Sequence, residues 1–234
     1  MEFSEVKERI KKVGGWLSPA EASILYRLGR GCSGKGAIVE IGSWQGKSTI
    51  CLAGASQAAG GKSRVIAIDP HIGSPEHQKT GEIWTFDKFK QNIRDAGLEK
   101  LVTPIVKMSG DAAADIREPV ELLFIDGAHE YEAVKQDFEQ YFPKLIDGGY
   151  IAFHDTIGWP GPEKLVAEAV FTSNRFRGAR FANSITYAQK VPANTAMDRL
   201  WNRLFLVIKN IYAAVYITLL KIKIKLAGRN TGEA

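Results

Sequence analysis

Acidic and histidine side chains follow short hydrophobic segments at five places in the sequence. Proteins use carboxylates and imidazoles to bind hydroxyl groups, move protons and hold metal ions. The carboxyl ends of parallel strands lie at one edge of a sheet, so side chains that follow such strands come together. Charged groups are costly to bury, and their collection at one edge predicts a functional site. The residues are Glu40, Asp69, Asp111, Asp126, His129, His154 and Asp155.

The first of these places has the pattern of a strand, a glycine-containing turn and a helix. Residues 37–41 are apolar except for Glu40, and Gly42 and Gly46 precede a helical pattern that runs to residue 59. A phosphate-binding P-loop ending at Gly46 would need a glycine where Ile41 stands. A dinucleotide-binding fingerprint would need one where Trp44 stands. Both common phosphate-binding turns are therefore excluded.

The position of Glu40 indicates the charge of a ligand. A carboxylate at the end of the strand would repel a pyrophosphate and attract a cation, and S-adenosylmethionine carries a sulfonium and an amino group. Asp69 follows Gly46 by 23 residues, where a carboxylate accepts hydrogen bonds from ribose hydroxyls. The turn of Ser109 and Asp111 would then lie beside the adenine. The alternatives are a strand–turn–helix without ligand, a solvated Asp69 and a plain helix cap at Ser109 or Asp111.

The order of predicted elements indicates an α/β fold with a Rossmann-like sheet. Five strands alternate with helices, at residues 37–41, 64–68, 101–106, 120–125 and 150–153. Asp147, Gly148 and Gly149 form the turn into the fifth strand. Residues 176–181 and 185–190 form a hairpin. We predict a mostly parallel seven-stranded sheet with helices on both faces and a C-terminal antiparallel hairpin.

Two further segments flank or interrupt this core. Ser18, Pro19 and Glu21 form a capping box that predicts a helix from residue 19 to about residue 28. The first 36 residues then serve either as a flap over the ligand or as edge packing. The polar loop of residues 71–82 carries His71 and His77, and we expect it to contact substrate.

Composition limits the function classes. The 234 residues are 45% hydrophobic, so one α/β domain with a sizeable core is expected. Cys32 and Cys51 cannot form a disulfide framework, and the charged residues 1–12 lack a signal-peptide pattern, so we expect a reducing cytoplasm. Seven Lys/Arg and two acidic residues lie from Asp198 onward, which leaves 24 of each sign in the body. A neutral body argues against a broad nucleic-acid-binding face.

Three motifs resemble those of class I S-adenosylmethionine-dependent methyltransferases. They lie at residues 40–49, 124–129 and 148–155, within a resemblance that covers residues 35–191. The sequence is most similar to small-molecule O-methyltransferases of the methyltransferase family 24 type. Macrolide-sugar O-methyltransferases and cephalosporin-hydroxylase-like proteins are related branches. We therefore predict three regions: an N-terminal helical preface at 1–36, the S-adenosylmethionine-binding methyltransferase domain implied by the resemblance at 37–191, and a basic amphipathic tail at 192–234.

The resemblance also implies residue roles. The methionine part of the cofactor would lie against the first turn, Asp69 would bind the ribose, and Ser109 and Asp111 would lie near the adenine. Asp126 matches a position that contacts the cofactor and, in metal-dependent members, binds the metal. His154 and Asp155, which follow the fifth strand, match a pair of acidic residues in several of those members. The implied first-turn residues are Glu40, Gly42, Ser43 and Gly46, and the implied metal ligands are Asp126, His154 and Asp155.

The implied reaction is methyl transfer to a hydroxyl of a small molecule or sugar. His129 is the candidate general base, and Asp126 is the second candidate catalytic residue. In the alternative interpretation, His129 only forms a hydrogen bond to the helix that follows it. A metal at Asp126 and Asp155 would instead lower the pKa of the hydroxyl. Because His154 replaces a carboxylate, Mn²⁺, Fe²⁺ or Zn²⁺ would suit the site better than Mg²⁺. Alternatives are a hydroxylase-like enzyme and a non-catalytic, membrane-recruited binding protein.

The tail has a pattern of its own. Apolar residues recur at helical spacing from residue 200 to 220, and Lys221, Lys223 and Lys225 follow. Lys209 and Asn210 interrupt the 20 or so apolar residues that a spanning helix needs. The pattern favours an interfacial helix over residues 200–226, with packing on a second copy or a spanning helix as alternatives. We expect a cytoplasmic protein at the inner membrane face, with a small-molecule acceptor.

Overall fold

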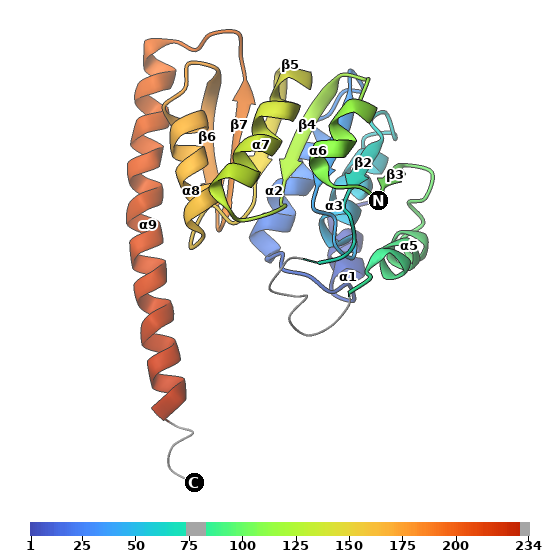
Figure 1. Cartoon of the computed structure of the whole chain (residues 1–234), viewed down its shortest axis with the longest axis horizontal. Helices are drawn as coiled ribbons and strands as arrows, with labels where there is room; N and C mark the ends of the chain where they lie inside the picture. The colour runs from blue at the N-terminus through green and yellow to red at the C-terminus, as the bar shows by residue number, and fades with distance from the viewer. Residues whose placement is uncertain (74–82, 230–234) are drawn as a thin grey trace.

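The computed structural model describes residues 1–73 and 83–229, and seven strands form one sheet within them (Figure 1). The strand order is β3-β2-β1-β4-β5-β7-β6. The first five strands pair in parallel, and β7 is antiparallel to β5 and β6. This confirms the predicted fold. The strands are β1 Ala37–Ile41, β2 Val65–Ile68, β3 Val102–Ile105, β4 Val120–Ile125, β5 Leu145–Phe153, β6 Phe176–Ala182 and β7 Ile185–Lys190.

The fifth strand begins earlier than predicted. Val120 pairs with Leu145, and Leu122 pairs with Tyr150, so residues 146–149 form an irregularity within β5. Gly148 has a φ of 87° there, which only glycine adopts without strain. The glycines that predicted a turn before the strand therefore mark a bulge inside it.

Helices cover the sheet in two groups, with hydrophobic clusters on either side of it (Figure 1). Alternate residues of one strand enter different clusters, as Ile38 and Val39 of β1 do. One cluster includes α1 Phe3–Ile10, α2 Pro19–Arg30, α3 Lys47–Ala58 and α5 Phe86–Asp95. The other includes α6 Ser109–Ala112, α7 Tyr131–Tyr141, α8 Pro160–Val166 and the π-helix η3 Ala167–Phe171. Short 3-10 turns, η1 Ala113–Asp115 and η2 Phe142–Lys144, extend α6 and α7.

The N-terminal segment covers the turn after β1. α2 begins with the predicted capping box, in which the Glu21 carboxylate accepts a hydrogen bond of 2.7 Å from the Ser18 N–H. Between α1 and α2, the Lys47 ammonium donates to the Gly15 carbonyl at 2.9 Å, and the ring centroids of Trp16 and Trp44 lie 6.1 Å apart. The preface thus lies against the first strand–helix turn.

The predicted substrate loop is only partly described. His77 lies outside the described residues. His71 is buried, and its Nδ1 lies 2.9 Å from the Thr85 hydroxyl while its ring packs against Phe86 and Phe89. His71 therefore packs in the core at this point of the fold.

The tail forms one long helix, α9 Ala196–Arg229, which runs along β6 (Figure 1). Asn202 is buried in this contact. Its side chain accepts from the Ala179 N–H at 3.0 Å and donates to the Phe176 carbonyl at 2.9 Å. These two bonds satisfy backbone groups of the edge strand β6 and attach the first half of α9 to the sheet.

Candidate functional site

Backbone hydrogen bonds join the ends of four strands in a row. The N–H of Gly42 donates to the Ile68 carbonyl, the N–H of Asp126 to the Ile41 carbonyl, and the N–H of His154 to the Ile125 carbonyl, at 2.8 to 2.9 Å. The loops after β2, β1, β4 and β5 therefore leave the sheet side by side. The structure brings most of the predicted residues to one edge.

The turn after β1 holds two buried polar atoms without a partner among the described residues. Glu40 is fully buried, its Oε2 accepts from the Thr49 hydroxyl, and its Oε1 has no hydrogen bond. Burial raises the pKa of Glu40 to about 8, against hydrogen bonds from Ser48 and Thr49 that lower it. The hydroxyl of Ser43 is also buried without a partner. Donors on a bound cofactor could satisfy these atoms.

Gly42 is required for packing at this turn. Its φ is +86°, and a Cβ built on it would lie 2.0 Å from the carbonyl oxygen of Asp126. The absence of a side chain lets the turns after β1 and β4 touch. Gly46, with a φ of 90°, precedes the first residue of α3.

Asp69 connects the end of β2 to the first turn. One carboxylate oxygen accepts from the Trp44 N–H at 2.7 Å and the other from the His71 N–H at 2.6 Å. A carboxylate oxygen accepts more than one hydrogen bond, so both oxygens can still receive ribose hydroxyls.

A buried carboxylate that the sequence analysis did not predict lies on α7, beside the turn after β3. Asp137 of α7 is buried, and burial raises its pKa to about 6 against the opposing effect of the Ser109 side chain. The Ser109 carbonyl accepts from the Tyr141 hydroxyl at 2.7 Å. The predicted Asp111, by contrast, is exposed on α6. The signal was present, because Asp137 stands between Val134 and Tyr141 on the inward face of an amphipathic helix.

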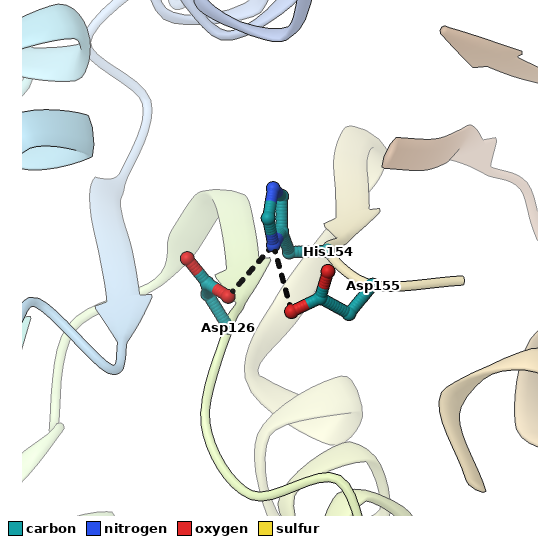
Figure 2. A group of neighbouring side chains, drawn as sticks. All are labelled: Asp126, His154 and Asp155. Carbon is teal, nitrogen blue, oxygen red and sulfur yellow. Dashed lines mark ion pairs between the residues drawn. The ribbon is translucent and has the colours of Figure 1, made fainter. Parts of the chain in front are cut away.

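His154 lies at the centre of three carboxylates, two of which, Asp126 and Asp155, are drawn in Figure 2. Its Nδ1 is 3.1 Å from Asp126 Oδ1 and 3.1 Å from Asp155 Oδ2, and its Nε2 is 3.6 Å from Glu21 Oε2. Burial alone would lower the pKa of His154, but the negative charges of Asp126, Asp155 and Glu21 raise it far above its usual range.

Asp155 connects His154 to His129. Its φ is 54°, a left-handed conformation uncommon for aspartate, and its Oδ2 also lies 3.0 Å from His129 Nε2. The Asp155 hydrogen bond raises the pKa of His129, against the opposing effect of burial. The rings of His129 and Trp159 stack with centroids 3.9 Å apart. Trp159 thus fixes the plane of the imidazole.

The same cluster has the donor set of a metal site. Asp126, His154 and Asp155 each offer one ligand atom, and these atoms lie within 4.8 Å of one another. Nδ1 of His154 is buried, and neither nearby carboxylate satisfies it with good hydrogen-bond geometry. A divalent ion would satisfy it, so the residues fit a metal with nitrogen and carboxylate ligands.

Glu21 is the second residue that sequence reasoning missed. Its Oε1 accepts from the N–H and hydroxyl of Ser184, at 3.0 and 2.6 Å, and from the Asn183 amide at 3.1 Å. Its capping-box position predicted a helix start and gave no sign of these long-range contacts. Glu21 thereby attaches the N-terminal segment to the hairpin turn and to His154.

Comparison with known proteins agrees with this architecture. The family model described as Methyltransferase domain matches residues 39–156, half of the chain. The uncharacterized protein y4gI of Sinorhizobium fredii (strain NBRC 101917 / NGR234) is 32% identical over 120 residues. These residues are 51% of this chain and 13% of that protein, so the chain spans only a small part of this curated relative.

Two solved structures share the fold. The O-methyltransferase NovP superposes with a TM-score of 0.64 at 18% identity, over 73% of this chain and 79% of that one. The O-methyltransferase TomG from Streptomyces achromogenes, involved in tomaymycin synthesis and solved in complex with S-adenosylmethionine, superposes with a TM-score of 0.57 at 16% identity. The match with TomG covers 81% of this chain and 89% of that one.

Proposed function

The chain belongs to the class I S-adenosylmethionine-dependent methyltransferases, in the family whose methyltransferase-domain model it matches, and we propose that it methylates a hydroxyl oxygen of a small molecule or sugar. The observation that carries the proposal is the His129–Asp155 pair, 3.0 Å apart, at the same sheet edge as two buried atoms without a partner among the described residues, Oε1 of Glu40 and the hydroxyl of Ser43. A proton acceptor thus lies near a turn that fits a cationic cofactor. The named relatives NovP and TomG, both O-methyltransferases, support this reaction class.

We assign the cofactor contacts residue by residue. Glu40 and Ser43, with Gly42 and Gly46 in the same turn, would hold the methionine part. Asp69 would accept the ribose hydroxyls, and Ser109 with Asp111 would lie near the adenine. The hydrogen bond from the Tyr141 hydroxyl to the Ser109 carbonyl attaches that turn to α7 and supports this placement.

The catalytic step requires removal of one proton. S-Adenosylmethionine, when bound, supplies an activated methyl group whose bond to sulfur breaks as the bond to the acceptor oxygen forms. Asp155 accepts from the Nε2–H of His129 in the tautomer that leaves Nδ1 free to take the hydroxyl proton. Trp159 keeps the imidazole in place by stacking. Asp126 and Asp155 stabilise the imidazolium that results.

A divalent metal is the second candidate for this step. Asp126, His154 and Asp155 would hold Mn²⁺, Fe²⁺ or Mg²⁺, and the orphaned Nδ1 of His154 favours such an ion. The ion would lower the pKa of a bound hydroxyl. Titration of the full chain with Mn²⁺, followed by the loss of the free-ion paramagnetic resonance signal, tests binding without reference to turnover. Wild-type protein should bind, and His154→Ala should not.

The exposed apolar face of α9 suggests where the protein works. We propose a cytoplasmic protein that contacts the inner membrane face through residues 200–226. In the alternative, a second copy of the chain packs on the exposed apolar face of α9. Within residues 1–73 and 83–229, one helix, Ala196–Ile224, is long and apolar enough to span a membrane, and 11% of its most apolar window is buried. Length and composition alone are weak support for spanning.

Calorimetry with S-adenosylmethionine tests the proposed function. The full chain should bind the cofactor at micromolar concentration, and methyl transfer to candidate acceptors should release S-adenosylhomocysteine. Absence of binding at millimolar cofactor would overturn the assignment. Binding without release from any acceptor would favour the non-catalytic alternative.

A further inference from the structure

The direction of α9 follows from the topology of the hairpin. β7 runs antiparallel to β5, with Thr186 beside Phe153 and Gln189 beside Tyr150. The chain therefore leaves β7 at the sheet edge opposite the site, and α9 must run back toward the site. Figure 1 shows α9 beginning at the end of the molecule to which the β7 arrow points, and running in the direction of the β4 arrow.

Tyr212 marks the level at which α9 reaches the site edge. Its ring centroid is 5.3 Å from that of Phe181, and its hydroxyl is 3.4 Å from Asn183 Oδ1. Asn183 lies in the turn between β6 and β7, and the hydroxyl of its neighbour Ser184 is 3.5 Å from His154 Nε2. α9 continues to Arg229 and thus extends about 25 Å beyond this level at 1.5 Å per residue (Figure 1).

The projecting part of α9 is apolar around its circumference. The side chains of Ile211, Val215 and Leu219 are 61%, 53% and 60% exposed. Before Tyr212, Asn202 and Lys209 are buried against the domain, while the outer face of α9 there also exposes apolar side chains such as Leu200 and Val207. A helix that faces only water would carry a polar face. The other exposed apolar residues beyond Tyr212 are Tyr216, Leu220, Ile222 and Ile224.

The charge of the segment is complementary to an anionic surface. Residues 199–232 contain seven Lys/Arg and no acidic residue. Lys221 and Lys223 are exposed at the distal end, between the apolar side chains. A helix that pairs with a second copy carries one apolar stripe between polar flanks. The all-round apolar surface with distal lysines fits lipid chains and anionic headgroups instead.

We propose that α9 docks on an anionic lipid bilayer and holds the site edge against it, so that the acceptor is an amphiphile anchored in that bilayer. This inference rests on the proposed methyltransferase function. The apolar turns from Ile211 to Ile224 enter the bilayer, and the long side chains of Lys221 and Lys223 extend from among the lipid chains toward anionic headgroups. The hydroxyl to be methylated then belongs to a headgroup, such as the sugar of a glycolipid, that reaches the His129 end of the site.

Vesicle flotation of the full chain tests the docking surface. The probes are vesicles of phosphatidylcholine alone and of phosphatidylcholine with about a quarter phosphatidylglycerol. Wild type should float with the anionic vesicles. The triple variant Ile211→Glu, Val215→Glu, Leu219→Glu should lose binding by more than about tenfold. The matched control Ile211→Leu, Val215→Ile, Leu219→Ile should bind like wild type. Equal flotation of all three proteins, or a dimer without lipid that only the glutamates break, would overturn the proposal.

Hydrogen exchange with and without anionic vesicles tests the orientation. Vesicles should protect the distal half of α9 and the site-edge segments around Trp159 and Asn183. The opposite edge, around Lys144, should exchange at an unchanged rate. Protection of the opposite edge alone would overturn the orientation, whatever the catalytic outcome.

The acceptor class is tested with labelled cofactor. The full chain and S-adenosylmethionine carrying a radioactive methyl group are incubated with a lipid extract or with a water-soluble extract of the cells that encode the protein. Label should enter the lipid extract, and the triple-glutamate variant should transfer less label to vesicle-bound lipid. Label confined to the water-soluble extract would overturn the acceptor class while supporting the methyltransferase. If the chain bound no cofactor, the proposed function would be refuted. Vesicle flotation and hydrogen exchange would still show whether α9 docks on anionic lipid.

Discussion

The Glu21 carboxylate of α2 lies 3.6 Å from His154 Nε2, although 133 positions separate the two residues and Glu21 precedes the matched methyltransferase segment. Both side chains are buried. The N-terminal segment therefore contributes a charge to the centre of the acidic and histidine cluster. A protein truncated before β1 would leave His154 with two carboxylates and expose the hairpin turn.

Glu21→Gln should destabilise the protein in a pH-dependent manner. Burial opposes ionisation of Glu21, but hydrogen bonds from His154 and Ser184 lower its pKa to about 2. This is below the unfolded value of about 4.3. The stabilisation is therefore complete above the unfolded pKa and is lost as pH falls through the folded pKa.

Urea unfolding should give a difference of about 2–4 kcal/mol between wild type and Glu21→Gln at pH 7. The difference should shrink as the pH is lowered from about 5 toward 2. The exposed Glu8→Gln is the matched control and should stay close to wild type. A difference that is the same at every pH would mean that Glu21 acts by shape rather than by charge.

Asp137→Asn should have the opposite pH dependence. Burial raises the pKa of Asp137 to about 6, so the folded protein retains a proton that the unfolded chain releases near pH 4. Stability from this group is present at low pH and is lost as pH rises through the folded pKa. Relative to Asp137→Asn, wild type should therefore lose about 2 kcal/mol between pH 4 and pH 7. Asp111→Asn, at an exposed position of α6, controls for the loss of one carboxylate. If the free energy of unfolding varied with pH in the same way for wild type and Asp137→Asn, the raised pKa of Asp137 would be refuted.

Asp69→Ala should weaken cofactor binding. The substitution removes the acceptor proposed for the ribose hydroxyls and frees the N–H groups of Trp44 and His71. We expect the dissociation constant of S-adenosylmethionine to rise at least about tenfold by calorimetry. Asp69→Asn keeps the size and one acceptor, and thermal unfolding of both variants checks the fold. Unchanged affinity in a folded Asp69→Ala protein would exclude the ribose contact.

The sequence predicted the strands better than the contacts between distant segments. Strand ends such as Ile41 and Ile125 are bounded by local signals, a hydrophobic run followed by glycine or aspartate, and these signals placed Asp126 and His154 at one edge. The contact of Glu21 with His154 depends on how α2 packs, for which local spacing carries no signal. The bulge in β5 was missed because Gly148 predicts a turn and a bulge equally well.

The orientation of side chains at the site was also beyond the sequence. Asp111 and Asp137 are both aspartates beside the turn after β3, and only packing places one outside and the other inside. His129 and Asp155 were both recognised as candidates, but their pairing depends on the left-handed backbone of Asp155. Such a conformation is not encoded in residue type for an aspartate.

The His129–Asp155 pair should set the pH dependence of methyl transfer. The Asp155 carboxylate raises the pKa of His129 above the ordinary 6.5 by hydrogen bonding to Nε2, although burial opposes the rise. A base must be unprotonated, so kcat/KM should increase as pH rises through this raised pKa. Asp155→Asn removes the charge, so the rising limb should move to lower pH. His129→Ala should lower kcat by about 10²–10⁴ and abolish the limb.

Trp159→Phe is the control for this series, because it keeps a ring against His129 without altering its charge partner. In Trp159→Phe, kcat/KM should rise at close to the same pH as in wild type. Rates are measured by S-adenosylhomocysteine release, with cofactor affinity determined separately at each pH. A limb that Asp155→Asn leaves in place would assign the titration to another group. His154 and His129 both contact Asp155, but of the two histidines only His154 offers a ligand atom to the metal cluster. If His129→Ala kept the wild-type rate while His154→Ala abolished both Mn²⁺ binding and turnover, proton removal would therefore be assigned to the metal cluster.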